Sequence, residues 1–193
     1  YTKKDEVTLR SSQIFRHTLG TDSSEDVLVF EEKDETFSCF IFKTKSRKYL
    51  MIGSYQTLST EYQFLDANDP VGKWQVIQPR ERNLEYSVSH FEDKFYIRTN
   101  WEAKNFRLMQ TSINSTSKAN WQEVIPHRQD VLLRSVDIFK NYLVVNERKD
   151  GLSKTRVINW KDNSEYYIKF NDPTYSLYSS SNLEFDTDLF RFV

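Results

Sequence analysis

The segment Trp74-Gln75-Val76-Ile77-Gln78-Pro79-Arg80 returns later in the chain as Trp121-Gln122-Glu123-Val124-Ile125-Pro126-His127-Arg128. The two tryptophans are 47 residues apart. A second, apolar segment repeats at nearly the same interval, since KYLMI at 48–52 returns as KFYIR at 94–98 and as NYLVV at 141–145. Two different segments that share one period indicate tandem structural repeats.

The order of signals within each repeat is also constant. An apolar strand comes first, a shorter mixed strand follows (Tyr62–Leu65, Phe106–Met109 and Arg156–Ile158), and a Trp-led segment closes the unit. Trp160 begins the third closing segment after a shorter interval of 39 residues. A unit of 40–50 residues with about four strands is typical of a β-propeller blade. Such a sheet buries both faces only between neighbours, so we expect Trp and Phe side chains to fill the space between blades.

Strand signals dominate the rest of the chain, as short runs of Val, Ile, Phe, Tyr and Leu separated by turn residues. The predicted strands are Val27–Phe30, Phe37–Lys43, Tyr49–Ser54, Glu61–Leu65, Gln75–Ile77, Glu85–Ser89, Lys94–Thr99, Phe106–Thr111, Glu123–Ile125, Leu132–Phe139, Tyr142–Arg148, Lys154–Asn159, Glu165–Phe170, Leu177–Ser179 and Glu184–Val193. One short helix is predicted over Ser11–Leu19, because Ile14, Phe15 and Leu19 can share a helical face and Gly20 can end it.

The predicted fold class is therefore all-β, a β-propeller segment of about four blades that occupies residues 1–193. Four units are few for a propeller, and Phe190–Val193 reads as the middle of a strand. We therefore expect part of a larger propeller that continues on both sides. A β-sandwich with chance similarity between strands and a closed four-bladed ring are the alternatives.

Composition narrows the classes of partner. Lys and Arg number 27 against 28 Asp and Glu, so the chain lacks the basic excess that nucleic acid binding requires. No apolar run is long enough to span a membrane, and no signal peptide is visible. Cys39 is the only cysteine, which fits a reducing compartment and predicts a cytoplasmic location. The sequon Asn114-Ser115-Thr116 is interpreted as a chance match.

No catalytic, cofactor or metal site is predicted. None of the four glycines brackets a serine as Gly-x-Ser-x-Gly, and no Gly-rich phosphate loop exists. The histidines are not at metal-ligand spacing and are expected to be structural or solvated: His17, His90 and His127. Cys39 lies within a predicted strand and is expected to be a small core residue.

Two acidic stretches have a functional and a structural interpretation. The run Glu31-Glu32-Lys33-Asp34-Glu35 could bind a cation or a basic peptide, but it joins two strands and is expected to be a solvated connection. Asp66, Asn68 and Asp69 could suggest calcium, but their spacing departs from a calcium-binding loop and favours a turn.

Three charged residues at strand ends are the candidate rim or domain-interface residues. Glu147 and Arg148 precede Asp150-Gly151, a dipeptide typical of a two-residue hairpin turn. Arg98 is the last residue but one of the equivalent strand, Lys94–Thr99, in the preceding repeat. Charges at such positions could face a tunnel or a partner domain, although a surface hairpin is the simpler interpretation for residues 147–152.

Several ordered segments resemble the propeller domain of the prolyl oligopeptidase family, in particular its oligopeptidase B (protease II) type. They are Gln13–His17, Leu19–Thr21, Asp26–Phe30 with Glu32 and Asp34, Thr44–Ser46, Tyr49, Glu61, Glu85-Tyr86, His90, Thr99-Asn100, Asn105-Phe106, Trp121, Glu147-Arg148 and Gly151-Leu152. Individually these matches are weak, but together they cover most of the chain in order.

This resemblance implies a seven-bladed propeller joined to an α/β-hydrolase domain that carries a Ser/Asp/His triad. Members of this type cleave short peptides after Arg or Lys, and the propeller is regarded as a lid and size filter. No triad motif matches this sequence, so the segment itself should be inactive, and the missing catalytic domain and short peptides are its expected partners.

Two other functions stay open at this stage. The same repeat would suit a stand-alone propeller that serves as a protein-interaction platform without enzymatic activity. A carbohydrate-active propeller is a weaker alternative, because no paired carboxylates mark a site for it.

Overall fold

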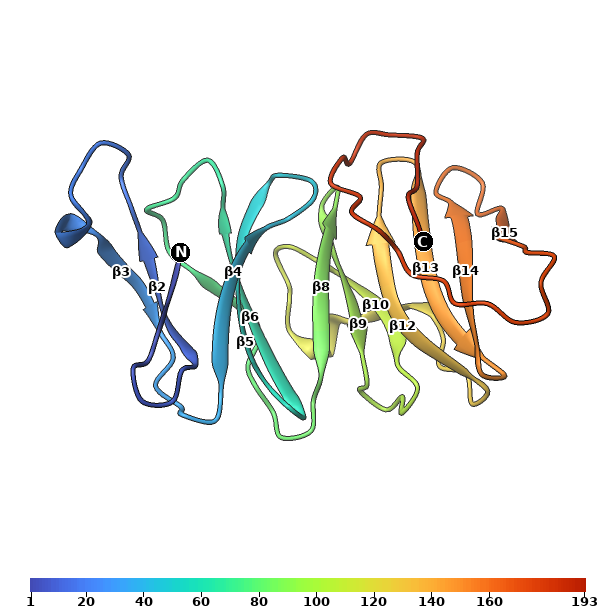
Figure 1. Cartoon of the computed structure of the whole chain (residues 1–193), viewed down its shortest axis with the longest axis horizontal. Coiled ribbons are helices and arrows are strands. Elements are labelled where there is room, and N and C mark those ends of the chain that lie inside the picture. Colours follow the sequence, from blue (N-terminus) through green and yellow to red (C-terminus); the bar gives the residue numbers. More distant parts are fainter. The chain divides into compact units, whose positions relative to one another are not determined.

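The computed structural model describes all 193 residues as two compact units, Tyr1–Glu85 and Tyr86–Val193 (Figure 1). Each unit contains two antiparallel sheets whose strands follow one another in chain order. The only helical segments are two single 3₁₀ turns, Ser23–Glu25 and Lys118–Asn120. Connections between consecutive antiparallel strands explain why the strand signals come at short, regular intervals along the sequence.

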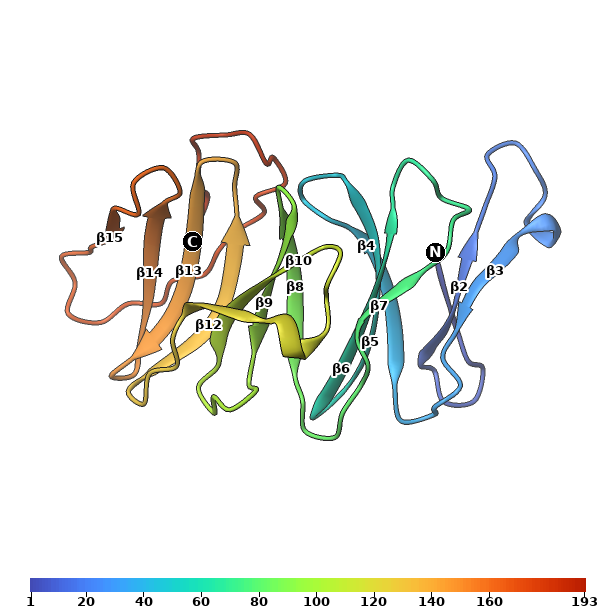
Figure 2. The same ribbon diagram turned by 180° about the vertical axis from the view of Figure 1, so that it is seen from behind.

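The first unit holds a three-stranded and a four-stranded sheet. The first sheet consists of β1 (Thr2–Lys4), β2 (Ser11–Arg16) and β3 (Val27–Glu31). The second consists of β4 (Ser38–Lys43), β5 (Tyr49–Gln56), β6 (Ser59–Asp66) and β7 (Gln75–Gln78), which forms its edge (Figure 2). Buried Ile14, Cys39 and Ile52 join the two sheets in one core cluster, against which Trp74 packs.

The second unit holds two four-stranded sheets. One consists of β8 (Tyr86–Phe91), β9 (Lys94–Thr99), β10 (Arg107–Ser112) and β11 (Gln122–Ile125). The other consists of β12 (Val131–Ile138), β13 (Tyr142–Lys149), β14 (Leu152–Asn159) and β15 (Glu165–Tyr167). Its main core cluster draws Tyr96 and Leu108 from one sheet and Leu143 and Val145 from the other, so the two sheets pack face to face as adjacent blades do.

The repeats seen in the sequence correspond to the sheets of the structure. Trp74 directly precedes β7, and Trp121 directly precedes β11, so both tryptophans introduce the fourth strand of a sheet. Trp160 departs from this pattern, because it directly follows β14 and lies before β15 begins. Its ring stacks on Phe91 of the preceding sheet with centroids 5.1 Å apart. The expectation that aromatic rings fill the space between blades is therefore confirmed within this unit.

The helix predicted over Ser11–Leu19 is wrong. Ser11–Arg16 is strand β2, which pairs with β1 on one side and with β3 on the other. Ile14 is buried in the core, whereas the Phe15 ring stacks on Tyr1 at 5.7 Å, and Leu19 is 92% exposed. Adjacent apolar residues that use opposite faces belong to a strand, and nine residues are too few for their periodicity to distinguish the two structures.

The prediction for the C-terminal region is also wrong in part. Neither Leu177–Ser179 nor Glu184–Val193 forms a regular strand, and only an isolated bridge joins Ser179 to Phe192. Tyr178 and Val193 exchange both backbone hydrogen bonds at 2.9 Å. Buried Asn182 bridges the two segments, because its amide nitrogen donates to the carbonyl of Arg191 at 2.9 Å and its oxygen accepts from the Arg191 amide at 2.7 Å. These contacts make a short hairpin-like pair in place of two strands.

Candidate functional site

Arg98 and Glu147, two of the three predicted residues, lie near one another in the second unit. The Nε of Arg98 on β9 donates to the carbonyl of Leu133 on β12 at 2.7 Å. Leu133 is in turn the register partner of Glu147 on β13. The Arg98 guanidinium also lies 3.6 Å from the centroid of the Phe106 ring, which is cation–π distance. Arg98 therefore connects two sheets of the unit.

Glu147 is not an exposed rim charge, because it is only 2% exposed. Its Oε1 accepts from Arg156 Nη2 at 2.8 Å and is also ion-paired with Arg128, while its Oε2 accepts from the Tyr167 hydroxyl at 2.9 Å. Desolvation acts to lower the pKa of Arg128, but hydrogen bonding with Tyr167 and the charge of Glu147 outweigh it and raise that pKa. The buried carboxylate is thus fully engaged within the unit, through partners on three different elements.

Arg148 points away from this cluster. It follows Glu147 on β13, is exposed, and faces the opposite side of the sheet because side chains alternate along a strand. The hairpin turn predicted beside it is confirmed, since Asp150 and Gly151 have positive φ angles of 52° and 80° between β13 and β14. A role of Arg98, Glu147 and Arg148 at a domain interface stays a prediction.

The first unit contains a similar buried carboxylate, which the sequence interpretation missed. Glu32 was expected to belong to a solvated connection, but it is 7% exposed and forms a bidentate pair with Arg80, with Nη1–Oε1 and Nη2–Oε2 distances of 3.2 and 2.8 Å. Arg80 also contacts Glu61, through its backbone N–H at 2.9 Å and its Nη2 at 3.2 Å. The acidic run is therefore anchored to its own unit at Glu32.

The electrostatics of this pair follow from its hydrogen bonds. Desolvation raises the pKa of the Glu32 carboxyl, but hydrogen bonds from Arg80, Ser54 and the Asp34 amide outweigh it, and the pKa lies below its ordinary value. Desolvation likewise lowers the pKa of Arg80, and its bonds to Glu32 and Glu61 more than reverse that effect. Both groups are held in their charged forms.

A recurrent signal for these clusters is present in the sequence. Arg80 follows Pro79, and Arg128 follows Pro126 by two residues, at the end of the two repeated Trp-led segments. Each arginine lies shortly after the last strand of a four-stranded sheet and pairs with a buried glutamate. The glutamates themselves, Glu32 and Glu147, occupy different places in their repeats, so the period alone could not pair them.

The remaining sequence candidates have structural surroundings. His17 Nδ1 lies 2.7 Å from the Asp26 carboxylate, and His90 is buried with its ring edge-on to Phe95. Burial, followed by the charge of Glu32, raises the pKa of the Cys39 thiol to about 11, which disfavours the thiolate that a nucleophile requires.

The Asp66 carboxylate accepts from the Asn68 amide at 2.8 Å, as expected for a turn. No group of three or more potential metal-ligating side chains is found, and no helix has the length and apolar character needed to cross a membrane.

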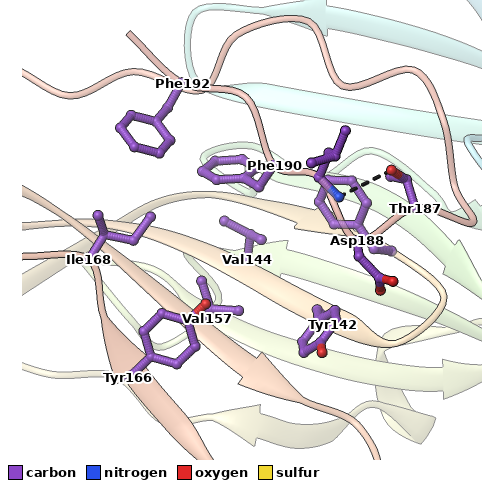
Figure 3. Close-up of a pocket in the computed structure, with 11 residues that line it drawn as sticks. Tyr142, Val144, Val157, Tyr166, Ile168, Thr187, Asp188, Phe190 and Phe192 are labelled. Atoms are coloured by element: carbon purple, nitrogen blue, oxygen red, sulfur yellow. Dashed lines mark hydrogen bonds between the residues drawn. The ribbon is translucent and has the colours of Figure 1, made fainter.

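The second unit also has an apolar groove of about 330 Å³ (Figure 3). Val144, Val157 and Tyr166 line it from β13, β14 and β15, and Phe190 and Phe192 line it from the C-terminal segment. Phe190 packs edge-on against Phe139 with centroids 6.2 Å apart. The segment before Val193 therefore partly covers the face of the last sheet that is turned away from β8–β11.

The sheets of each unit have the form of successive blades of a β-propeller. Residues 1–193 match the family described as prolyl oligopeptidase, N-terminal β-propeller domain. The chain therefore belongs to the prolyl oligopeptidase family.

Known relatives support the same assignment. Dipeptidyl aminopeptidase BI of Pseudoxanthomonas mexicana is 37% identical over 193 residues, which are 100% of this chain and 26% of that protein. Protease 2 of Moraxella lacunata is 33% identical over 97% of this chain and 26% of its own length. Among solved structures, oligopeptidase B from Trypanosoma brucei with covalently bound antipain, in a closed form, matches 100% of this chain and 28% of its own with a TM-score of 0.92 and 26% identity. The chain thus spans about a quarter of the length of these relatives.

Proposed function

We propose that this chain is the non-catalytic propeller portion of a serine oligopeptidase, and that the complete protein hydrolyses short peptides after Arg or Lys. The observation that carries the proposal is the match of all 193 residues to the propeller domain of the family, together with a TM-score of 0.92 to an oligopeptidase B. The catalytic residues would lie in an α/β-hydrolase domain encoded by the same gene.

In this proposal the propeller contributes by excluding water and large substrates from the active site. A cover over an active site keeps out water and large substrates, and it need not supply any reacting group. The buried Arg–Glu clusters support this role, since each cluster holds strands and connections of its own unit together. A lid that closes over the active site would limit entry by size.

The test uses the complete protein translated from the full reading frame. We expect it to cleave fluorogenic peptides that end in Arg or Lys, to discriminate against the same sequence embedded in a folded protein, and to be inhibited by antipain, which is bound in the Trypanosoma brucei structure. Equal cleavage of short peptides and folded proteins would contradict the size-filter role. A serine-directed phosphonate should abolish the activity.

The alternative is a stand-alone interaction platform, which the same repeats would suit. This alternative requires that the reading frame downstream of this segment contains no Gly-x-Ser-x-Gly motif with a later Asp and His in catalytic order. A reading frame of that kind would refute the peptidase proposal, whatever the activity of the purified chain.

We also propose a cytoplasmic location, based on the single, buried cysteine. Cell fractionation with antibodies against the complete protein tests it, and recovery from an extracellular or periplasmic fraction would contradict it.

A further inference from the structure

A second groove of the last sheet, of about 460 Å³, is lined by more basic than acidic side chains. It lies beside the Glu147 cluster, and strands β13, β14 and β15 and the segment after them form its walls. Its charged lining residues are Arg128, Glu147, Lys149, Lys154, Lys169 and Asp172. Four of these residues are basic and two are acidic.

After the ion pairs of the structure are counted, the groove keeps more unpaired positive than negative side chains. Glu147 already accepts from Arg128, Arg156 and Tyr167, and Lys149 is paired with Asp130 at 3.0 Å. No ion pair joins Lys154, Lys169 or Asp172 to any side chain of opposite charge. Two unmatched ammonium groups therefore face one unmatched carboxylate.

Lys154 is the more constrained of the two ammonium groups. It is half-buried on β14, directly across from Glu147 in the strand register. Its Nζ donates to the Tyr175 hydroxyl at 3.2 Å and lies 5.4 Å from the centroid of the same ring. An ammonium group has three donors, so positions remain for an incoming oxygen. A half-buried cation without a counter-ion is a favourable place for an anion.

An apolar wall stands next to this ammonium group. The Phe170 and Tyr175 rings pack together with centroids 4.7 Å apart, and Phe170 is 38% exposed. A ligand that places a carboxylate on Lys154 can therefore lay a neighbouring apolar or aromatic group against these rings. Inorganic phosphate would use the charge but leave this wall uncovered, and a nucleic acid would need a far larger basic surface.

We propose that this groove binds a peptide carboxylate next to an aromatic residue, with Lys154 as the principal contact and Lys169 as the second cation. The ligand is an acidic peptide, and its carboxylate can come from a side chain or from a free C-terminus. The inference does not depend on the proposed hydrolytic function.

Binding is measured by isothermal titration calorimetry on the complete protein. The probes are the peptide N-acetyl-Phe-Glu-amide, its neutral twin N-acetyl-Phe-Gln-amide, and N-acetyl-Gln-Phe with either a free C-terminus or, as its neutral twin, an amidated one. None contains Arg or Lys, so the measurement is independent of hydrolysis after basic residues. The pairs of probes separate the two sources of the carboxylate.

We expect the acidic probes to bind at least about tenfold more tightly than their neutral twins, as one charge-assisted hydrogen bond predicts. Lys154→Gln should remove this preference, whereas Lys154→Arg should keep most of it. Lys161→Gln is the matched control, because Lys161 is an exposed lysine outside the groove and should bind as the wild type does. If Lys154→Gln fails to fold by circular dichroism, Lys169→Gln on the exposed wall takes its place, with a smaller loss expected.

Three results would overturn the proposal. These are equal affinity for acidic and neutral probes, no binding of either probe at millimolar concentration, and unchanged affinity in folded Lys154→Gln protein. Loss of peptidase activity with intact binding would count against the proposed function alone.

Discussion

At the residue scale, the most constrained group of the second unit is the Glu147 carboxylate. Removing it would leave two guanidinium groups, of which Arg156 is only 11% exposed, without their shared counter-charge. We expect Glu147→Ala to lower the free energy of unfolding by about 3 kcal/mol, the cost of breaking one side of a buried ion pair. Urea unfolding followed by circular dichroism measures the change.

The matched control for this prediction is Glu165→Ala. Glu165 bonds the same arginine, Arg156, at 3.0 Å, but its side chain is 48% exposed. Its loss should cost less than about 1 kcal/mol. Equal effects of the two substitutions would show that burial does not govern the strength of the Glu147 cluster.

The Glu32–Arg80 pair predicts how stability depends on pH. The pKa of Glu32 is lowered in the folded state, so its contribution is fully present above the unfolded-state value, near 4.5, and is lost as the pH falls through the folded-state pKa. We expect the thermal midpoint of the wild type to fall between pH 5 and about pH 3 more steeply than that of Glu32→Gln. Glu35→Gln, an exposed residue of the same acidic run, should keep the wild-type slope. Parallel slopes in all three proteins would contradict the assignment.

At the element scale, strand β5 needs a glycine at position 53. Gly53 is the register partner of Phe40, whose ring covers the place where a Cβ would lie. That ring is confined by Tyr55 and Tyr62, with centroids 5.7 and 5.9 Å away, so it has little room to move. We expect Gly53→Ala to destabilise the protein by about 1–3 kcal/mol through overpacking.

A double-mutant cycle checks this explanation. In a Phe40→Ala background the ring is absent, so Gly53→Ala should cost much less than in the wild type. Chemical unfolding of the four proteins gives the coupling energy. If the cost is the same in both backgrounds, the glycine is needed for its backbone and not for the space above it.

At the scale of the whole molecule, the chain folds as two compact units. Cys39, His17 and His90 are held in structural surroundings, and no serine has the sequence context of a nucleophile elbow. We therefore expect the purified 193-residue chain to hydrolyse no Arg- or Lys-ended fluorogenic peptide above the buffer rate. The complete protein, assayed in parallel, is the control. Hydrolysis that follows the 193-residue chain through purification would refute the non-catalytic role.

The sequence interpretation succeeded for features that neighbouring residues define and failed for features that depend on residues far apart in the chain. Lys94–Thr99 was predicted with its observed bounds, and most other strands were placed to within one or two residues, because alternation and turn residues are properties of neighbouring positions. Ser11–Arg16 was misassigned, since Ile14 and Phe15 become distinguishable only once β1 and β3 define the two faces of the sheet. Glu32 was misjudged for a similar reason: its partner Arg80 is 48 residues away.

The sequence by itself determined the all-β class, the 47-residue repeat and the family, because these are encoded in short-range periodicity and in ordered local segments. Only the tertiary structure decided which charges are buried and paired. Burial depends on the neighbouring sheet, and an ion pair joins positions that no local pattern relates. The tertiary structure therefore separated Glu147, which is enclosed in its cluster, from Arg148, which is exposed, although the two residues are adjacent in the sequence.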